Sequence, residues 1–144
     1  MGKARGLSAN LHLVWKSEVA KVEVENGLVL GWGMVCTEKG EDHYDLQGDH
    51  IPESVMVKST TDFMLNSRVA KEMHTGEAVG SIVHSFPLTK DAADKLGIIT
   101  EKTGWLVAMK PDDPAVLQKY IDGTYTGFSI GGTCAYVADE RQAA

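Results

Sequence analysis

Alternating apolar and polar residues near the amino terminus predict two paired β-strands. Residues 19–24 read Val-Ala-Lys-Val-Glu-Val, and residues 28–36 are rich in Leu and Val. Such runs are typical of half-buried strands, whose side chains point to opposite faces in turn. The Asn26-Gly27 step between them predicts a two-residue hairpin turn, because a type I′ turn needs positive φ at both residues. Glycines inside the second run predict a bend or bulge there.

The spacing of apolar residues predicts a long helix in the middle of the chain. Met56, Phe63 and Ala70 lie seven positions apart and would share one face of a helix. Pro52 suits the first turn, and a glycine lies just past the predicted end. We therefore predict a helix over residues 51–73.

Capping residues predict two shorter helices further along. Thr89 can cap a helix that runs through Leu96, and Asp113-Pro114 begins one that runs through Ile121. Apolar β-rich runs predict further strands at residues 78–86, with Pro87 ending the strand, at 104–109 and at 126–137. No βαβ repeat occurs. The pattern predicts an α+β fold, a mostly antiparallel β-sheet or small barrel with about three helices packed outside.

Length and composition are those of an ordinary globular domain. The 144 residues are 43% hydrophobic and 24% charged, which excludes a disordered or fibrous chain. One domain of this size buries a sizeable core without metals or disulfides. We expect that domain at residues 18–138, between a flexible lead-in at 1–17 and a flexible tail at 139–144.

Charge and apolar content exclude several classes of partner. The net charge of −6, without a basic run, argues against nucleic-acid binding. No apolar run approaches the roughly 18 residues of a membrane span, and the start of the chain lacks a signal-peptide core, which favours a cytosolic protein. Cys36 and Cys134 are too few and too far apart for a zinc or redox motif, so we expect both to be buried hydrophobic residues.

A serine between glycines is a candidate nucleophile. Ser129 lies between Gly127 and the Gly131-Gly132 pair in a β-like run. Glycines let the backbone approach a substrate closely and present N–H groups to an oxyanion. No helix pattern follows, so the segment is not the nucleophile elbow of an α/β-hydrolase. The alternative interpretation is a small serine at a crowded position of a barrel.

A serine nucleophile needs a base, and histidine is the usual one. His74 lies at a helix-to-strand junction, where a side chain can face a shallow site; a histidine that complements the helix dipole is the alternative. His84 and Ser85 are neighbours in a strand, point to opposite faces and cannot form a pair. His43 and His50 are loop residues without metal-ligand spacing, so we expect no metal site.

Five blocks of sequence occur in a specific order: VLGWG at 29–33, DLQGDHI at 45–51, GSIVHSF at 80–86, TGWLV at 103–107 and GTYTGFSIGG at 123–132. A helix and His74 follow the second block. In order and spacing these blocks resemble the phage prohead (capsid maturation) serine proteases, whose fold is similar to herpesvirus assemblin. The resemblance covers about residues 28–136.

The resemblance implies a serine endopeptidase with Ser129 as nucleophile and His74 as general base. Backbone N–H groups near Gly131-Gly132 could help to hold the oxyanion. Assemblins use a second histidine as the third catalytic member, and the phage enzymes use a carboxylate. Asp49 is the first candidate for that role. The alternatives that stay open are His84, Asp139, Glu140 and a member outside this chain.

The implied substrates are the scaffold and major capsid proteins inside the assembling prohead, in the host cytoplasm, together with the protease itself. No cofactor, nucleic acid or membrane is implied, and a homo-oligomer stays open. Relatives continue with another strand, which implies a trimmed catalytic domain or a missing part of the fold. The alternatives are a non-catalytic structural or scaffold component of the virion with the same fold and a small ligand-binding barrel that uses Trp32, Trp105 and Phe128.

Overall fold

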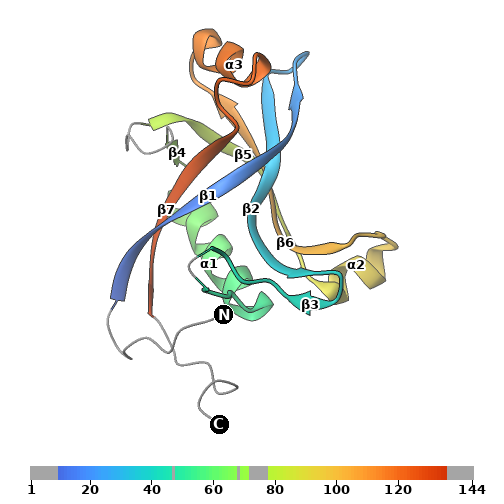
Figure 1. Cartoon of the computed structure of the whole chain (residues 1–144). Helices are drawn as coiled ribbons and strands as arrows, with labels where there is room; N and C mark the ends of the chain where they lie inside the picture. Colours follow the sequence, from blue (N-terminus) through green and yellow to red (C-terminus); the bar gives the residue numbers. More distant parts are fainter. Residues whose placement is uncertain (1–9, 47, 68, 72–77, 136–144) are drawn as a thin grey trace.

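A computed structural model describes residues 10–46, 48–67, 69–71 and 78–135 of the chain (Figure 1). The strands in these residues are β1 (Asn10–Glu23), β2 (Leu28–Glu38), β3 (Glu41–Asp42), β4 (Val69–Lys71), β5 (Ala78–Leu88), β6 (Lys102–Pro111) and β7 (Gly127–Ala135). The helices are α1 (Glu53–Asn66), α2 (Lys90–Leu96) and α3 (Pro114–Ile121). None of the helices in the described ranges is long and apolar enough to span a membrane.

The strands form one antiparallel sheet in the order β1-β7-β4-β5-β6-β2-β3, with an additional pairing between β1 and β2. The long strand β1 makes its two pairings with different segments: residues 10–18 lie along β7 and residues 18–23 along β2. In Figure 1, β1 accordingly crosses from β7 to β2. The predicted α+β fold, with a mostly antiparallel sheet and three helices, is confirmed.

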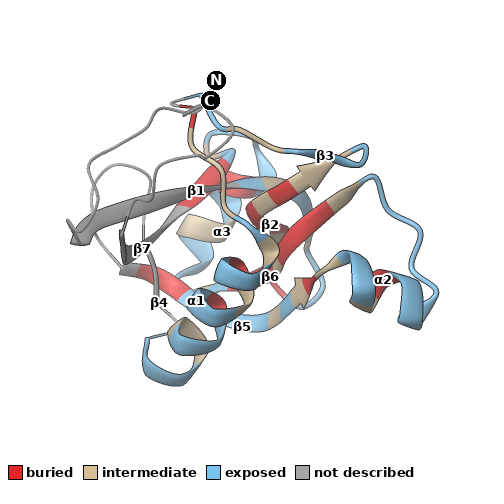
Figure 2. Cartoon of the chain, turned by 90° about the horizontal axis from the view of Figure 1, so that it is seen from below, coloured by how far each residue is buried: buried red, intermediate tan, exposed pale blue. Residues whose placement is uncertain are grey.

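A core of large side chains joins the sheet to α1. Trp105 of β6, Phe128 of β7 and Met56 of α1 are completely buried. Phe63 of α1 meets Trp105 edge-on, with the ring centroids 5.3 Å apart, which is a favourable aromatic geometry. Figure 2 shows α1 beside the buried parts of the strands. This packing fixes the end of α1, and therefore the start of β4, relative to the sheet.

The first strand is longer than the sequence predicts. Residues 10–17, which we expected in a flexible lead-in, belong to β1 and pair in register with β7. The apolar-polar alternation of residues 19–24 marks only the second half of this strand. The first half is a strand because β7 offers it a hydrogen-bonding edge, which is a tertiary cause that no local pattern reports.

The first hairpin is confirmed, but its two-residue turn is wrong. Glu23 pairs with Leu28, so the turn spans residues 24–27. The Gly27 N–H donates to the Val24 carbonyl at 3.2 Å, and Gly27 has a φ of 68°. Asn26 keeps an ordinary φ, and its N–H donates to the Glu23 carboxylate at 3.0 Å. That side-chain bond satisfies a turn donor and supports a longer turn than Asn-Gly by itself predicts.

The central helix is shorter than predicted, because it ends at Asn66 rather than near residue 73. The Asn66 amide donates back to the Asp62 carboxylate at 2.8 Å and to its carbonyl at 3.1 Å. Residues 69–71, which continue the seven-residue spacing, form β4 and pair with β5. Strand pairing therefore overrides a helical period that continues by coincidence.

Both shorter helices are confirmed with their caps. The Thr89 hydroxyl accepts from the Ala92 N–H at 3.1 Å, and Gly97 closes α2 with a φ of 70°. The Asp113 carboxylate accepts from the Ala115 N–H at 2.7 Å and so caps α3. Pro87 does not end β5, which continues to Leu88. In the described residues, β4 pairs with residues 78–81 of β5, so the missing N–H of Pro87 is tolerated beyond that pairing.

Candidate active site

Ser129 lies on β7, between its neighbouring strands β1 and β4. Its Cα partners are Lys16 on β1 and Lys71 on β4, and Lys71–Ser129 is the register pair between β4 and β7 in the described residues. The preceding residues anchor this part of β7: Phe128 is buried in the core, and the Gly127 carbonyl accepts from the Tyr120 hydroxyl of α3 at 3.0 Å. The backbone of Ser129 is therefore held between β1 and β4.

His74 lies outside the described residues, in the connection between β4 and β5. Lys71, at the end of β4, is paired both with Ser129 of β7 and with Ala78 of β5. In the sequence, His74 follows Lys71, the register partner of Ser129, by three positions.

Asp49 lies in the loop that precedes α1. The Asp49 N–H donates to the Asp45 carboxylate at 2.9 Å, the Asp45 N–H donates to the Asp49 carbonyl at 2.9 Å, and Gly48 turns the loop with a φ of 80°. The 14 residues of α1 then span about 21 Å before the chain reaches β4. Asp49 and β4 are thus attached to opposite ends of α1.

The strand register separates His84 from Ser129. His84 is six positions along β5 from Ala78, the residue opposite Lys71, which corresponds to about 20 Å of strand. Its side chain is exposed, whereas the hydroxyl of the next residue, Ser85, accepts from the buried Trp105 indole N–H at 2.7 Å. The expected opposite directions of His84 and Ser85 are present.

The remaining candidates from the sequence are two acids, Asp139 and Glu140, and two glycines, Gly131 and Gly132. Asp139 and Glu140 lie outside the described residues. Gly131 and Gly132 lie within β7, in register with Val14 and Leu13 of β1.

The end of the sheet next to α3 presents an acid that the sequence did not single out. The Asp112 N–H donates to the Val79 carbonyl at 2.9 Å, which extends the pairing of β6 with β5 by one residue. The Asp112 carboxylate is exposed and makes no hydrogen bond or ion pair with the described residues. The sequence analysis identified the adjacent Asp113, as the cap of a helix. The one sequence feature that marks Asp112 is its place directly after an apolar strand.

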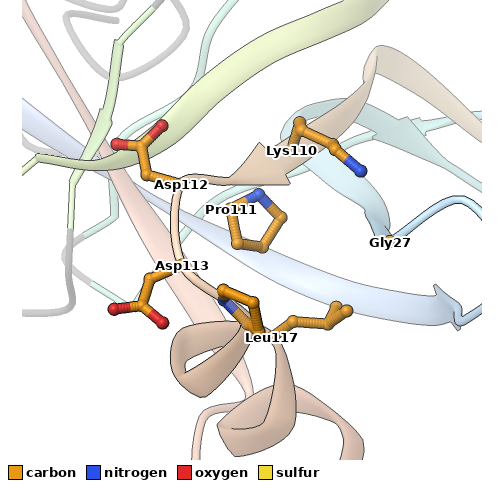
Figure 3. A pocket seen from close by; sticks show the side chains of 7 residues that line it. Gly27, Lys110, Pro111, Asp112, Asp113 and Leu117 are labelled. Carbon is orange, nitrogen blue, oxygen red and sulfur yellow. The ribbon is translucent and has the colours of Figure 1, made fainter.

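A hollow of about 240 Å³ lies beside these residues, between the β1–β2 turn and the start of α3 (Figure 3). It is lined by Gly27, Lys110, Pro111, Asp112, Asp113, Pro114 and Leu117. The Lys110 ammonium donates to the Asn26 carbonyl at 2.5 Å. Figure 3 shows the carboxylates of Asp112 and Asp113 directed away from Lys110. The lysine thus holds the turn rather than neutralising either acid.

The described part of the chain contains no cluster of three or more His, Cys, Asp or Glu residues suited to a metal ion. The His50 Nδ1 lies 2.9 Å from the His43 carbonyl, and its Nε2 lies 3.7 Å from the Asp42 carboxylate. Cys36 is fully buried, and burial, followed by the charge of Glu53, raises its thiol pKa to about 12. A thiol with that pKa is protonated at neutral pH and is a poor nucleophile.

Comparison with known proteins identifies one family. The model of the family described as "Putative phage serine protease XkdF" matches residues 16–138. Neither the curated proteins nor the solved structures include a significant match.

Proposed function

Because the chain belongs to the family described as "Putative phage serine protease XkdF", we propose that it is a serine endopeptidase of prohead maturation, with Ser129 as nucleophile and His74 as general base. The observation that carries the proposal is the pairing of Ser129 with Lys71, three residues before His74. This pairing joins two segments that are far apart in sequence.

The proposed reaction is acyl transfer in two steps. The Ser129 Oγ forms a bond to the scissile carbonyl carbon while His74 accepts the hydroxyl proton, and the carbonyl oxygen takes the negative charge. Collapse of this intermediate breaks the C–N bond, and the leaving amine takes the proton from His74. Water then attacks the acyl ester with His74 as base, which releases the acid and restores the serine hydroxyl. No cofactor takes part.

The oxyanion needs hydrogen-bond donors that are in place before the reaction. We assign this role to backbone N–H groups near Gly131 and Gly132, which follow Ser129 in β7. For the third catalytic member, the resemblance points to Asp49.

The proposed substrates are the scaffold and major capsid proteins of the phage, with self-cleavage as a further reaction. The reaction then takes place inside the assembling prohead in the host cytoplasm. Family membership supports a phage protein as substrate, since the family is one of phage proteases.

The first test is covalent trapping of the nucleophile. The full chain is treated with a serine-directed fluorophosphonate, the labelled peptide is located by mass spectrometry, and cleavage of the phage scaffold protein is measured in parallel. Ser129→Ala should abolish labelling and lower the cleavage rate by about 10⁴–10⁶, a typical cost of losing a nucleophile. Ser54→Ala, an exposed serine on α1, is the matched control and should leave both unchanged.

Unchanged cleavage by Ser129→Ala would contradict the assignment of the nucleophile. A folded wild-type chain that is neither labelled nor active would instead support a non-catalytic structural component of the virion.

A further inference from the structure

The strand register places a lysine on either side of Ser129. Ser129 of β7 is the Cα partner of Lys16 on β1 and of Lys71 on β4. Residues directly opposite one another in an antiparallel sheet belong to the same face, with Cα atoms about 4.5–5.5 Å apart. One row across the three strands therefore reads Lys16, Ser129, Lys71, and we call it the lysine row.

The lysine row is placed on the face of β7 opposite to the core. Successive residues of a strand belong to opposite faces of the sheet. Phe128, which precedes Ser129, is completely buried in the hydrophobic core. Its register partner on β1 is Ser17, the residue after Lys16. The core therefore takes one face of this part of the sheet, and the lysine row belongs to the other.

The lysine row concentrates positive charge in an acidic chain. The whole sequence has 14 Lys and Arg against 20 Asp and Glu. Two strand spacings, about 10 Å, separate Lys16 from Lys71, so the two cations repel each other weakly and both favour an anion between them. Glu18, which pairs with Gly127 one row further along the same face, offsets part of this charge. The row itself keeps two cations beside the proposed nucleophile.

We propose that Lys16 and Lys71 form a subsite for a carboxylate side chain of the substrate, so that the protease prefers scissile bonds next to an aspartate or glutamate. This inference rests on the proposed function, in which Ser129 attacks the scissile bond. Residues of an extended substrate follow one another at about 3.3 Å, so those flanking the bond lie at distances from Ser129 like those of the two lysine backbones. Lysine ammonium groups bind carboxylates through charge-assisted hydrogen bonds.

A lysine beside a serine has a second possible role, as the general base. That role needs a neutral amine, whereas carboxylate binding needs the charged ammonium. Arginine separates the two, because it keeps the positive charge and is not deprotonated in proteins. Replacement of either lysine by arginine should therefore preserve a carboxylate subsite and abolish a base.

The test compares substrates that differ only in charge. Peptides that tile the phage scaffold protein are made in two forms, one native and one with every Asp and Glu changed to Asn and Gln. Cleavage by the full chain is followed by mass spectrometry. The cleaved bonds should lie next to Asp or Glu, and kcat/KM should be about tenfold higher for the native form of these peptides. This preference should shrink at high ionic strength.

Variants assign the preference to the lysine row. Lys16→Gln and Lys71→Gln should each lower the ratio of the two kcat/KM values, and the double variant should bring it close to one. Lys16→Arg and Lys71→Arg should keep the ratio. Lys21→Gln, at an exposed position on the half of β1 that pairs with β2, is the matched control and should leave it unchanged. Because both substrates are measured on one enzyme sample, incomplete folding of a variant does not change the ratio.

A ratio near one in the wild type, or a ratio that Lys16→Gln and Lys71→Gln leave unchanged, would overturn the subsite. Loss of kcat in Lys71→Arg as well as in Lys71→Gln would overturn it too, because it would assign Lys71 to proton transfer.

Binding gives a readout that does not depend on catalysis. Ser129→Ala should bind the native peptides more tightly than their amide forms in fluorescence anisotropy, and Lys71→Gln in the same background should remove the difference. A wild type that neither cleaves nor is labelled by the fluorophosphonate contradicts the proposed function. The binding difference, present or absent, then still decides for or against the carboxylate subsite.

Discussion

At the scale of single residues, hydrogen bonding already made elsewhere decides which polar groups remain available for chemistry. Asp113 and Thr89 are both engaged as helix caps, and the Ser85 hydroxyl is engaged by the Trp105 indole. A residue committed in this way costs stability when it is removed and is a poor candidate for proton transfer.

The proposed base makes a prediction about pH. If His74 is the general base, kcat/KM should rise with pH through a pKa near 6–7, the ordinary range of histidine, because only the neutral imidazole accepts the serine proton. His74→Ala should abolish this rise together with the activity. His84→Ala, on an exposed and distant part of β5, should have the smaller effect. A more damaging His84→Ala would reverse the assignment of the base.

At the scale of elements, the β1–β2 hairpin depends on one backbone conformation. Gly27 has a φ of 68° and is buried under the Lys110 and Leu117 side chains. A Cβ at this position would lie 3.0 Å from the Lys110 Nζ. The turn thus requires glycine for its φ and also leaves little room for a side chain.

Gly27→Val should therefore lower the free energy of unfolding by about 1–2 kcal/mol, the cost of forcing a bulky residue to positive φ. The measurement is a thermal or urea melt. Glu25→Val, an exposed change in the same turn, is the control and should have little effect. An unchanged melting temperature in Gly27→Val would argue against this turn. The experiment tests the fold and says nothing of catalysis.

At the scale of the whole molecule, β1 connects the candidate site to the opposite part of the sheet. Its first half pairs with β7, including the Lys16–Ser129 pair, and its second half pairs with β2. Residues 10–17, which the sequence analysis expected in a flexible lead-in, therefore pair with the strand that contains the proposed nucleophile.

Removal of residues 1–17 should destabilise the fold, because it removes most of the pairing between β1 and β7. Each ladder hydrogen bond contributes about 1 kcal/mol net, so loss of the pairing with β7 should reduce the free energy of unfolding by several kcal/mol. Fluorophosphonate labelling of Ser129 should fall with it. A chain that begins at residue 10 keeps β1 and serves as the comparison. Equal melting temperatures for the two truncated chains would contradict the role given to β1.

The sequence by itself determined the structures that depend on near neighbours. The caps of α2 and α3 and the hairpin between β1 and β2 were all predicted, because a cap or turn is decided by residues a few positions apart. The sequence also singles out Ser129 between glycines and His74 after a helix, and their catalytic roles stay predictions.

Only the tertiary structure decided which distant segments lie together. In the folded chain, α1 ends at Asn66 and residues 69–71 form a strand. Lys71 pairs with Ser129, and the Asp112 N–H donates to the Val79 carbonyl. Strand pairing exchanges hydrogen bonds between segments far apart in the chain, and the energy of each pair depends on the whole sheet being formed. Local patterns therefore could predict that these strands exist, but the sheet as a whole determined their neighbours and their register.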